Sequence, residues 1–281
     1  MGNKIYISLT RYKESNELLH ESLIAISKQR KIIAHVLMLD QQDNEYTRIL
    51  CKSISNERVN VEYIVIPPEG LSIARNKAIK LCQDDILLFI DADAVPDPDW
   101  AWNLNKTLSK SNVFIAGGKI IPRWHKRYPI ICKSPLVKEQ FSLLDRGAGE
   151  VLVSRVVGAN FGINKSKYKD HFYFDEKLGR REGTLLGGEE SDLCARINKA
   201  GGLIMYNGNA LVEHQILPDR LTWKWIIRRF YAAGLGRAIG GGAPNPGQKL
   251  QLLDYMVMPV ILPGYALGFL VGKAMKLKKK L

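Results

Sequence analysis

Short apolar runs alternate with amphipathic stretches over the first third of the chain. The apolar runs are rich in β-branched residues, and the stretches between them carry apolar residues at helical spacing. This alternation is typical of βαβ units and predicts an α/β fold with a mostly parallel sheet flanked by helices. The predicted strands cover 5–9, 32–39, 61–66 and 86–90, and the predicted helices cover 18–27, 46–54 and 72–82, the last capped by Ser72.

The fourth apolar run, 86–90, ends abruptly at Asp91, Ala92 and Asp93. An unbroken apolar run is expected of a strand that helices cover on both faces. In open α/β sheets ligands bind outside the carboxyl ends of the strands, so the two aspartates stand where a site is expected. Two such carboxylates suit a hard cation that also contacts substrate phosphates. A D-x-D pair by itself is as common in plain surface turns as in metal sites, so the rest of the chain must decide between the two.

The remaining elements are less regular. A helix rich in Trp, Arg and Tyr is predicted from Leu221 to about 233, and a Gly/Pro run over 240–247 predicts a boundary. Between the aspartates and that helix the pattern predicts a helix at 100–108, a strand at 113–121, an irregular region at 122–151, a strand at 156–163, a mobile loop at 179–188, a helix at 189–200 and a strand pair over 203–212.

Composition narrows the choice of partner only partly. The chain has 281 residues, 46% of them hydrophobic, which is enough for a full core. Its net charge of +13 favours phosphorylated ligands, nucleic acid or an acidic lipid surface. The four cysteines form no C-x-x-C pair, and the apolar run at the N-terminus is too short for a signal peptide. We therefore expect reduced thiols and a cytoplasmic protein.

Seven segments, in their order and spacing, resemble family 2 glycosyltransferases of the GT-A fold. The resemblance covers roughly residues 4–235 and rests on the segments 70–76, 91–93, 96–100, 157–163, 174–179, 188–193 and 212–214. It implies a GT-A type, Rossmann-like, mixed and mostly parallel sheet. It also implies an inverting enzyme that moves a sugar from a nucleoside-diphosphate sugar to an acceptor hydroxyl, in bacterial polysaccharide or glycoconjugate synthesis.

The resemblance assigns a metal site to three of these residues. Asp91 and Asp93 would hold Mn²⁺ or Mg²⁺ against the diphosphate of the donor, with Asp93 as the direct ligand. His214, at the end of an apolar strand, would be an additional contact to the metal or the diphosphate. A lone histidine more often simply packs, but an imidazole is a suitable ligand and the position matches.

The resemblance also implies a donor site, with a UDP-sugar as the expected donor. Its implied residues are Thr10, Arg11, Asp40, Arg75, Asp91, Ala92 and Asp93, with Arg228, Arg229 and Tyr231 closing over the diphosphate. Gln41 and Gln42 replace the usual acidic or small residues of the family, which leaves the nucleotide base of the donor open. The helix that carries Arg228 could equally serve packing or lipid contact.

The family has a Glu-Asp pair beneath the acceptor, and this chain has Glu189 and Glu190 there. A carboxylate within hydrogen-bond reach can take the proton of an attacking hydroxyl, because that proton becomes acidic during attack. Glu190 is the predicted base and Glu189 the second choice. Asp192 and Asn160 are predicted to face the acceptor. Alternatively, the acidic residues only favour a helix N-terminus.

These assignments divide the chain into a transferase domain, 1–235, and a tail, 236–281. The nucleotide half would cover about 1–121 and the acceptor half about 122–235. The C-terminal apolar tail, 255–272, is barely long enough to cross a bilayer, and Pro259 and Pro263 interrupt it. Lying in the interface or packing on the domain is therefore favoured over crossing, and the lysines that follow would meet anionic headgroups at the inner face of the membrane.

Two other classes of function remain open at this point. One is a binding protein for a nucleotide sugar, a lipid or nucleic acid, although the scattered basic residues do not interleave with aromatics as RNA binding requires. The other is a nucleotidyltransferase, which would use similar carboxylates but attack at phosphorus. The acceptor stays open among a glycan, a lipid-linked molecule and a small molecule.

Overall fold

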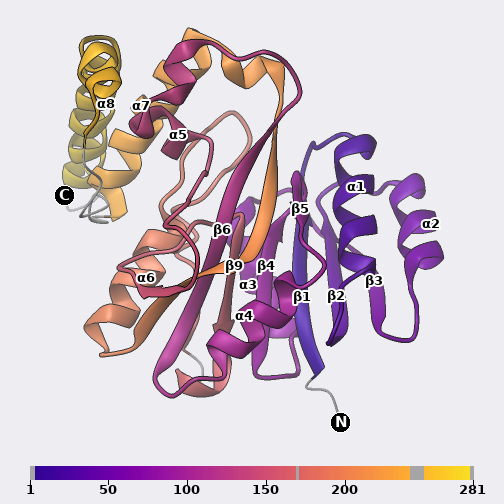
Figure 1. The fold of residues 1–281 in the computed structure, drawn as a ribbon. Coiled ribbons are helices and arrows are strands. Elements are labelled where there is room, and N and C mark those ends of the chain that lie inside the picture. Colours follow the sequence, from indigo (N-terminus) through magenta and orange to yellow (C-terminus); the bar gives the residue numbers. More distant parts are fainter. Residues whose placement is uncertain (1–3, 169–170, 241–249, 279–281) are drawn as a thin grey trace.

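The computed structural model describes residues 4–168, 171–240 and 250–278. It contains a single sheet with helices on both faces (Figure 1). The strands are β1 Lys4–Arg11, β2 Ile33–Asp40, β3 Val59–Val65, β4 Ile86–Asp91, β5 Ala94–Pro96, β6 Val113–Trp124, β7 Glu150–Leu152, β8 Asn160–Asn164 and β9 Leu203–Ile216. The helices are α1 Asn16–Ser27, α2 Glu45–Ile54, α3 Leu71–Leu81, α4 Trp100–Leu108, α5 Pro135–Gln140, α6 Glu189–Lys199, α7 Trp223–Gly240 and α8 Leu252–Lys278.

The strand order β3-β2-β1-β4-β8-β6-β9-β5 confirms the predicted mixed sheet. Strands β1 to β4 run parallel, as the βαβ rhythm of the sequence predicts. Strand β8 enters antiparallel between β4 and β6, and β9 pairs in parallel with β6. The carboxyl ends of β1, β2 and β4 therefore meet at one edge of the sheet, where a site is expected.

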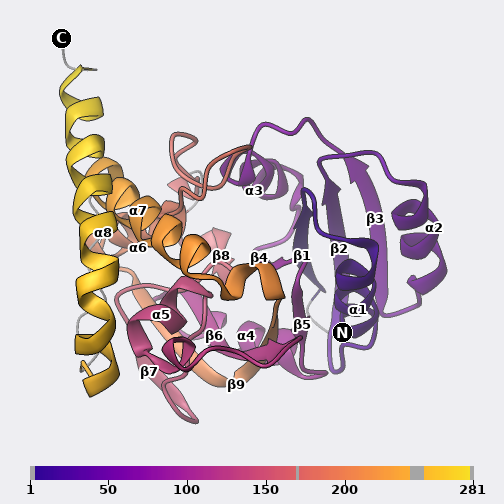
Figure 2. The same ribbon diagram turned by 90° about the horizontal axis from the view of Figure 1, so that it is seen from above.

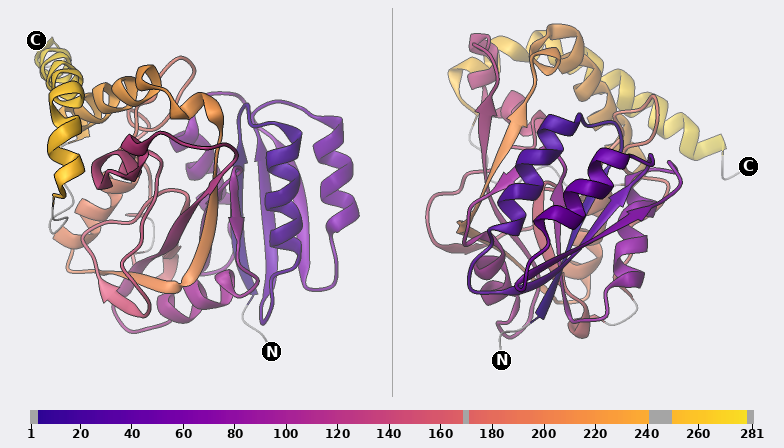
Figure 3. Two further views of the ribbon diagram at one scale, coloured as in Figure 1. Left: turned by 45° about the horizontal axis from the view of Figure 1, so that its top comes forward. Right: turned by 90° about the vertical axis from the view of Figure 1, so that its right-hand side faces the viewer.

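Alternate side chains of β4 explain why its sequence is apolar throughout. Leu88 and Ile90 pack in one core with α1, α2 and α4, whereas Leu87 and Phe89 pack in the opposite core with α3 and α6. The two views of Figure 3 show these helices on the two sides of the sheet. A strand buried on both faces keeps a stiff position, so the aspartate at its end is held firmly.

Several element boundaries differ from the sequence prediction. Helix α3 begins at Leu71 with Gly70 at its N-cap in a positive-φ conformation, and the Ser72 hydroxyl donates to the Leu178 carbonyl instead of capping. Strand β8 begins only at Asn160. The predicted strand pair over 203–212 is one long strand, β9, and the predicted irregular region contains α5 and β7.

The C-terminal helices also correct the prediction. Helix α7 runs past its predicted end at about 233 to Gly240, and most of the predicted Gly/Pro boundary falls in 241–249, outside the described residues. Helix α8 continues through Pro259 and Pro263, so the expected interruption is wrong. Both prolines are exposed on α8.

Glycines bring α7 and α8 into close contact along one face. A Cβ atom on Gly268 would lie 2.0 Å from the Tyr231 carbonyl oxygen, and one on Gly234 would lie 2.0 Å from the Tyr265 carbonyl oxygen. Gly264, Gly268 and Gly272 thus form a small-residue face at four-residue spacing. The expectation that the tail packs on the domain is confirmed for this face of α8.

The opposite face of α8 is apolar and exposed. It carries Leu252, Met256, Val260, Leu267, Leu270 and Leu277. By length and composition, Leu252–Leu277 could cross a membrane, and most of it is not buried. Figures 1 and 2 show α8 as the outermost layer, at the end of the molecule away from α2.

Candidate functional site

A cavity of about 330 Å³ lies at the carboxyl ends of β1 and β4; we call it the strand-end cavity. Thr10 lines it from the end of β1, and Asp91, Ala92 and Asp93 line it from the end of β4. The segment 180–185 lines it from the loop before α6. A pocket with carboxylates on one wall and basic loop residues on the other can take a phosphorylated ligand together with a cation.

Strand pairing brings the third predicted metal residue to the two aspartates. Strand β5 pairs with β9 so that Ala94 lies opposite His214, and the Gln215 N–H donates to the Asp93 carbonyl oxygen at 2.9 Å. The Nε2 atom of His214 lies 3.1 Å from the Asp93 carboxylate. One ligand atom from each of Asp91, Asp93 and His214 falls within 4.8 Å of the others.

The charge around Asp93 keeps it ionised. Burial acts to raise the pKa of Asp93, but His214 and Arg220 outweigh it and hold that pKa well below its usual range. Arg220, in the turn before α7, donates to the second carboxylate oxygen at 2.9 Å. No sequence motif marks Arg220, because only the fold brings it next to Asp93, 127 residues earlier in the chain.

This donor set fits a divalent cation. Two carboxylates and an imidazole are suitable ligands for Mn²⁺, and Asp91 keeps a partly exposed carboxylate directed at the strand-end cavity. The Nδ1 atom of His214 is buried without a hydrogen-bond partner among the described residues. The imidazole is therefore fixed from the side of Asp93 alone.

Arg75, on α3, joins this group to the acidic start of α6. Its guanidinium donates to Asp91 at 3.2 Å, to Glu189 at 3.0 Å and to Glu190 at 3.2 Å. It also donates to the Gly158 carbonyl oxygen. The sequence predicted Arg75 as a cation on the nucleotide side. Instead, its side chain is buried and bound to carboxylates, and it does not line the strand-end cavity.

Glu189 and Glu190 differ although they are neighbours on α6. Glu189 is 2% exposed, and its Oε2 atom has no partner among the described residues. Burial raises the pKa of Glu189 to about 7, the charge of Glu190 adds to this rise, and Arg75 opposes it. The side chain of Glu190 is 17% exposed and uses one carboxylate oxygen on Arg75. Glu190 is thus the carboxylate that a molecule can reach.

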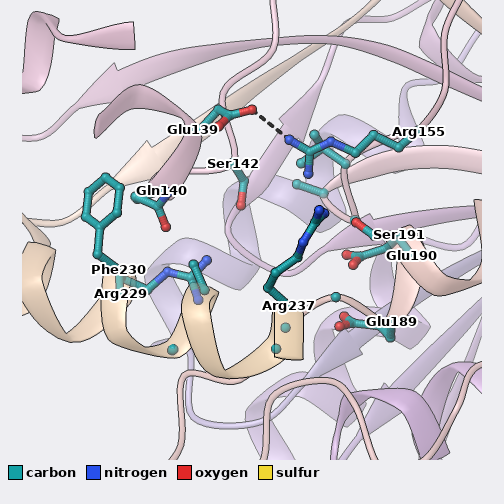
Figure 4. Close-up of a pocket in the computed structure, with 18 of the residues that line it drawn as sticks. Glu139, Gln140, Ser142, Arg155, Glu189, Glu190, Ser191, Arg229, Phe230 and Arg237 are labelled. Carbon is teal, nitrogen blue, oxygen red and sulfur yellow. Dashed lines mark hydrogen bonds and ion pairs between the residues drawn. The ribbon is translucent and has the colours of Figure 1, made fainter. Parts of the chain in front are cut away.

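A second cavity, of about 440 Å³, lies between α6, α7 and α8; we call it the helix-side cavity (Figure 4). Glu189 and Glu190 form its acidic end beside Ser191, and Figure 4 shows Arg229 and Arg237 entering from α7. Its apolar wall comes from Leu136, Leu143, Met258, Ile261, Leu262 and Tyr265. The two cavities share Leu71, Asp91 and Arg180, so they meet at the end of β4.

Arg11 and Asp40 differ from their predicted role at the donor. Asp40 is completely buried and pairs with the Arg11 guanidinium at 3.4 Å, and Arg11 also donates to Thr47 at 2.7 Å. Neither side chain lines the strand-end cavity. They instead join the ends of β1 and β2, and Gln41 reaches the cavity in their place.

The two residues predicted to face an acceptor lie outside the helix-side cavity. The Asn160 side chain is fully buried, accepts a hydrogen bond from the Trp100 indole at 2.7 Å and donates to the Lys119 and Ala210 carbonyl oxygens. Asp192 accepts a hydrogen bond from Arg196 on the outer side of α6. Neither lines the helix-side cavity.

The three residues predicted to close over a diphosphate separate in the structure. Arg228 lines the strand-end cavity and Arg229 lines the helix-side cavity. Tyr231 lines neither, and its backbone contacts Gly268 of α8. Arg180, which the sequence analysis did not single out, lines both cavities. The basic loop 179–188 was its only sequence signal.

Residues 8–172 match glycosyl transferase family 2. The chain belongs to this family. It is therefore a glycosyltransferase, as the sequence resemblance predicted. Two relatives support this. A glucosyl-dolichyl phosphate glucuronosyltransferase of Haloferax volcanii is 25% identical over 244 residues, which cover 83% of this chain and 74% of the relative. The succinoglycan biosynthesis protein ExoM of Rhizobium meliloti is 24% identical over 229 residues, 76% of this chain and 67% of the relative.

Solved structures share the GT-A fold. A mannosyltransferase of Pyrobaculum calidifontis, in complex with GDP-Man and Mn²⁺, superimposes with a TM-score of 0.62 at 16% identity, over 96% of this chain and 75% of that one. GalNAc-T7 with UDP, GalNAc and Mn²⁺ superimposes with a TM-score of 0.60 at 15% identity, over 92% of this chain and 54% of that one. At these identities the likeness establishes the fold alone. The predicted fold class is confirmed.

The raised pKa of Glu189 predicts how stability depends on pH. The folded protein holds this proton up to about pH 7, whereas the unfolded chain loses it near 4.5, so the stabilisation is present below pH 4.5 and is lost as the pH rises through 7. Glu189→Gln keeps the shape without the charge. We expect its free energy of unfolding, relative to wild type, to rise by roughly 2 kcal/mol between about pH 5 and pH 8 in denaturant titrations. A difference independent of pH would contradict the raised pKa.

Proposed function

We propose that the protein moves a sugar from a nucleoside-diphosphate sugar, bound in the strand-end cavity, to an acceptor hydroxyl in the helix-side cavity. One observation carries this proposal: the two cavities meet at Asp91, with the Asp91–Asp93–His214 group on one side and Glu189 and Glu190 on the other. A diphosphate and a base on opposite sides of one reacting carbon fit a single displacement with inversion.

Asp91, Asp93 and His214 would hold Mn²⁺ or Mg²⁺ at the diphosphate. When bound, the cation supplies positive charge to the leaving diphosphate. The metal in the two similar structures supports this assignment, because both contain Mn²⁺ together with a nucleotide or nucleotide sugar. Their nucleotides, GDP-Man and UDP, differ, and the family resemblance makes a UDP-sugar our proposal for the donor.

The residues of the chain supply the rest of the chemistry. Glu190 takes the proton of the acceptor hydroxyl as its oxygen bonds to the anomeric carbon, and the bond from that carbon to the diphosphate oxygen breaks. Lys13, Arg180 and Arg228 line the strand-end cavity and stabilise the charge that the departing nucleoside diphosphate gains. Arg75, which also lines the helix-side cavity, orients Glu190 through their ion pair at 3.2 Å.

The relatives point to a biological setting. One acts on a dolichyl phosphate-linked sugar and another belongs to succinoglycan biosynthesis. We accordingly propose a role in polysaccharide or glycoconjugate synthesis.

Binding of the donor can be tested without knowing the acceptor. In a panel of nucleotide sugars with Mn²⁺, at least one should raise the melting temperature, and a chelator should abolish the rise. Asp93→Asn should lose the response, because an amide binds the cation more weakly than a carboxylate. Asp43→Asn, at an exposed ion pair with Arg48, should keep it. If no nucleotide sugar acts on the wild type, a binding protein for another ligand becomes the better explanation.

The role of Glu190 has its own kinetic signature. Glu190→Gln should lower kcat by about 10²- to 10⁴-fold, the usual effect of removing a general base, while donor binding stays unchanged. Glu57→Gln, in an exposed turn after α2, is the matched control and should retain full activity. Unchanged turnover in Glu190→Gln, with loss in Glu189→Gln, would assign the base to Glu189 instead.

We also propose that the enzyme works in the cytoplasm, attached to the inner face of the membrane through α8. The exposed apolar face of α8 supports attachment, and the exposed Lys273 and Lys276 near its end match anionic headgroups. All four cysteines are buried and unpaired, which fits a reducing compartment.

Sedimentation with anionic phospholipid vesicles tests this attachment. Met256→Glu with Leu270→Glu should reduce the bound fraction strongly, because two charges would enter the apolar layer. Ile49→Glu, on exposed α2 at the other end of the molecule, should not. Equal binding of both variants would exclude α8 as the membrane-contacting element.

A further inference from the structure

The helix-side cavity combines positive charge and apolar surface in a way that ordinary glycan binding does not require. Its cations include Arg155, Arg229 and Arg237. Arg155 pairs with Glu139 at 2.6 Å. Neither Arg229 nor Arg237 forms an ion pair with a carboxylate among the described residues. Arg229 and Arg237 thus bring positive charge that no direct ion pair neutralises within the described residues, although Glu189 and Glu190 line the same cavity.

Arg229 shows that this charge is costly without an anion. Its Nη1 atom donates to the Leu185 carbonyl oxygen at 2.6 Å, and its buried Nε–H has no partner among the described residues. Burial and the nearby charge of Arg180 together lower the pKa of Arg229 to about 9, although Glu189 and Glu190 act to raise it. A buried cation beside another cation is stabilised when an anion binds between them.

Arg237 lies further along α7 than Arg229 and points into the same helix-side cavity. Figure 4 shows its guanidinium directed between Ser142 on one side and Glu190 with Ser191 on the other. Arg237 has no hydrogen-bond partner in the described part of the chain and does not line the strand-end cavity. Its charge is therefore available to a ligand on the acceptor side, close to the proposed base.

The apolar wall of this cavity continues onto the surface of α8. Met258, Ile261 and Tyr265 line it from the side that faces α7. Leu262 both lines the cavity and is 50% exposed on α8. An apolar chain could therefore leave the cavity past Leu262 and continue along the exposed apolar face of α8, the face proposed to contact the membrane.

We infer that the helix-side cavity binds a lipid phosphate: Arg229 and Arg237 hold the phosphate, and the apolar wall ending at Leu262 holds the first part of the lipid chain. This inference rests on the proposed function and names the class of its acceptor. A lipid phosphate and a lipid phosphate that carries a sugar share this chemistry. Glu190 is required for attack by a sugar hydroxyl but not by an ionised phosphate oxygen.

Binding of farnesyl phosphate tests the assignment directly. The wild type should bind farnesyl phosphate at least about tenfold more tightly than farnesol or inorganic phosphate, because only farnesyl phosphate contacts both the arginines and the apolar wall. Arg237→Gln should weaken the binding of farnesyl phosphate by roughly tenfold or more, and Arg237→Lys should recover part of the lost affinity. Lys224→Gln, an exposed cation on the same helix, should change nothing.

The outcomes separate this inference from the proposed function. Equal binding of farnesol and farnesyl phosphate, equal binding of inorganic and farnesyl phosphate, or an unaffected Arg237→Gln would each overturn the inference. Nucleotide sugars with Mn²⁺ should stabilise Arg237→Gln as they stabilise wild type. If they stabilise neither protein while farnesyl phosphate binds through Arg237, the proposed function fails and the lipid phosphate site stands.

Transfer assays then distinguish a lipid phosphate from a lipid phosphate that carries a sugar as the acceptor. With the matching nucleotide sugar, farnesyl phosphate and glucosylated farnesyl phosphate serve as alternative acceptors. If the sugar-bearing lipid is the acceptor, Glu190→Gln should abolish its use; if farnesyl phosphate itself is used, its transfer should survive that substitution. Binding of both with transfer to a lipid-free sugar alone would overturn the inference.

Discussion

The ion pairs of Arg75 hold the two halves of the site together. One buried guanidinium binds Asp91 from the end of β4 and both glutamates from the start of α6. It packs over the rings of Phe161 and Phe174, with its central carbon 5.5 and 5.6 Å from their centres. Removing one partner from such a buried cluster leaves uncompensated charge and typically costs about 3–5 kcal/mol. The metal group and the proposed base are thus positioned by the same side chain.

Three carboxylates around one guanidinium leave the cluster with excess negative charge. This excess adds to the effect of burial in raising the pKa of Glu189, and it makes a divalent cation and the basic loop residue Arg180 favourable neighbours. On the far side of the helix-side cavity the imbalance is reversed, with Arg229 and Arg237 lacking carboxylate partners among the described residues. The two cavities therefore differ in what they attract, although they share one wall.

The fold of the first half could be predicted from the sequence because each signal there is local. The run 86–90 is apolar because β4 is covered on both faces, and an aspartate directly after such a strand can only lie at the sheet edge. Glu189 and Glu190 follow a glycine-rich loop at a helix start, again a local pattern.

The roles of side chains that act across the fold could not be predicted in this way. Asn160 looks like a polar residue near a site, but only the packed Trp100 and the carbonyl groups of two neighbouring segments show that it is a core residue. Arg220 and Arg237 carry no motif, and their importance depends on which cavity each reaches. Helix α8 gave a misleading signal, since it continues through both of its prolines.

The position of the cation tests the account most directly. Crystals grown with UDP and Mn²⁺ would locate the metal by its anomalous scattering. The account predicts a peak at roughly 2.0–2.4 Å from carboxylate oxygens of Asp91 or Asp93, with His214 beside it and the diphosphate in the strand-end cavity. A diphosphate in the helix-side cavity, or a metal away from these three residues, would contradict it.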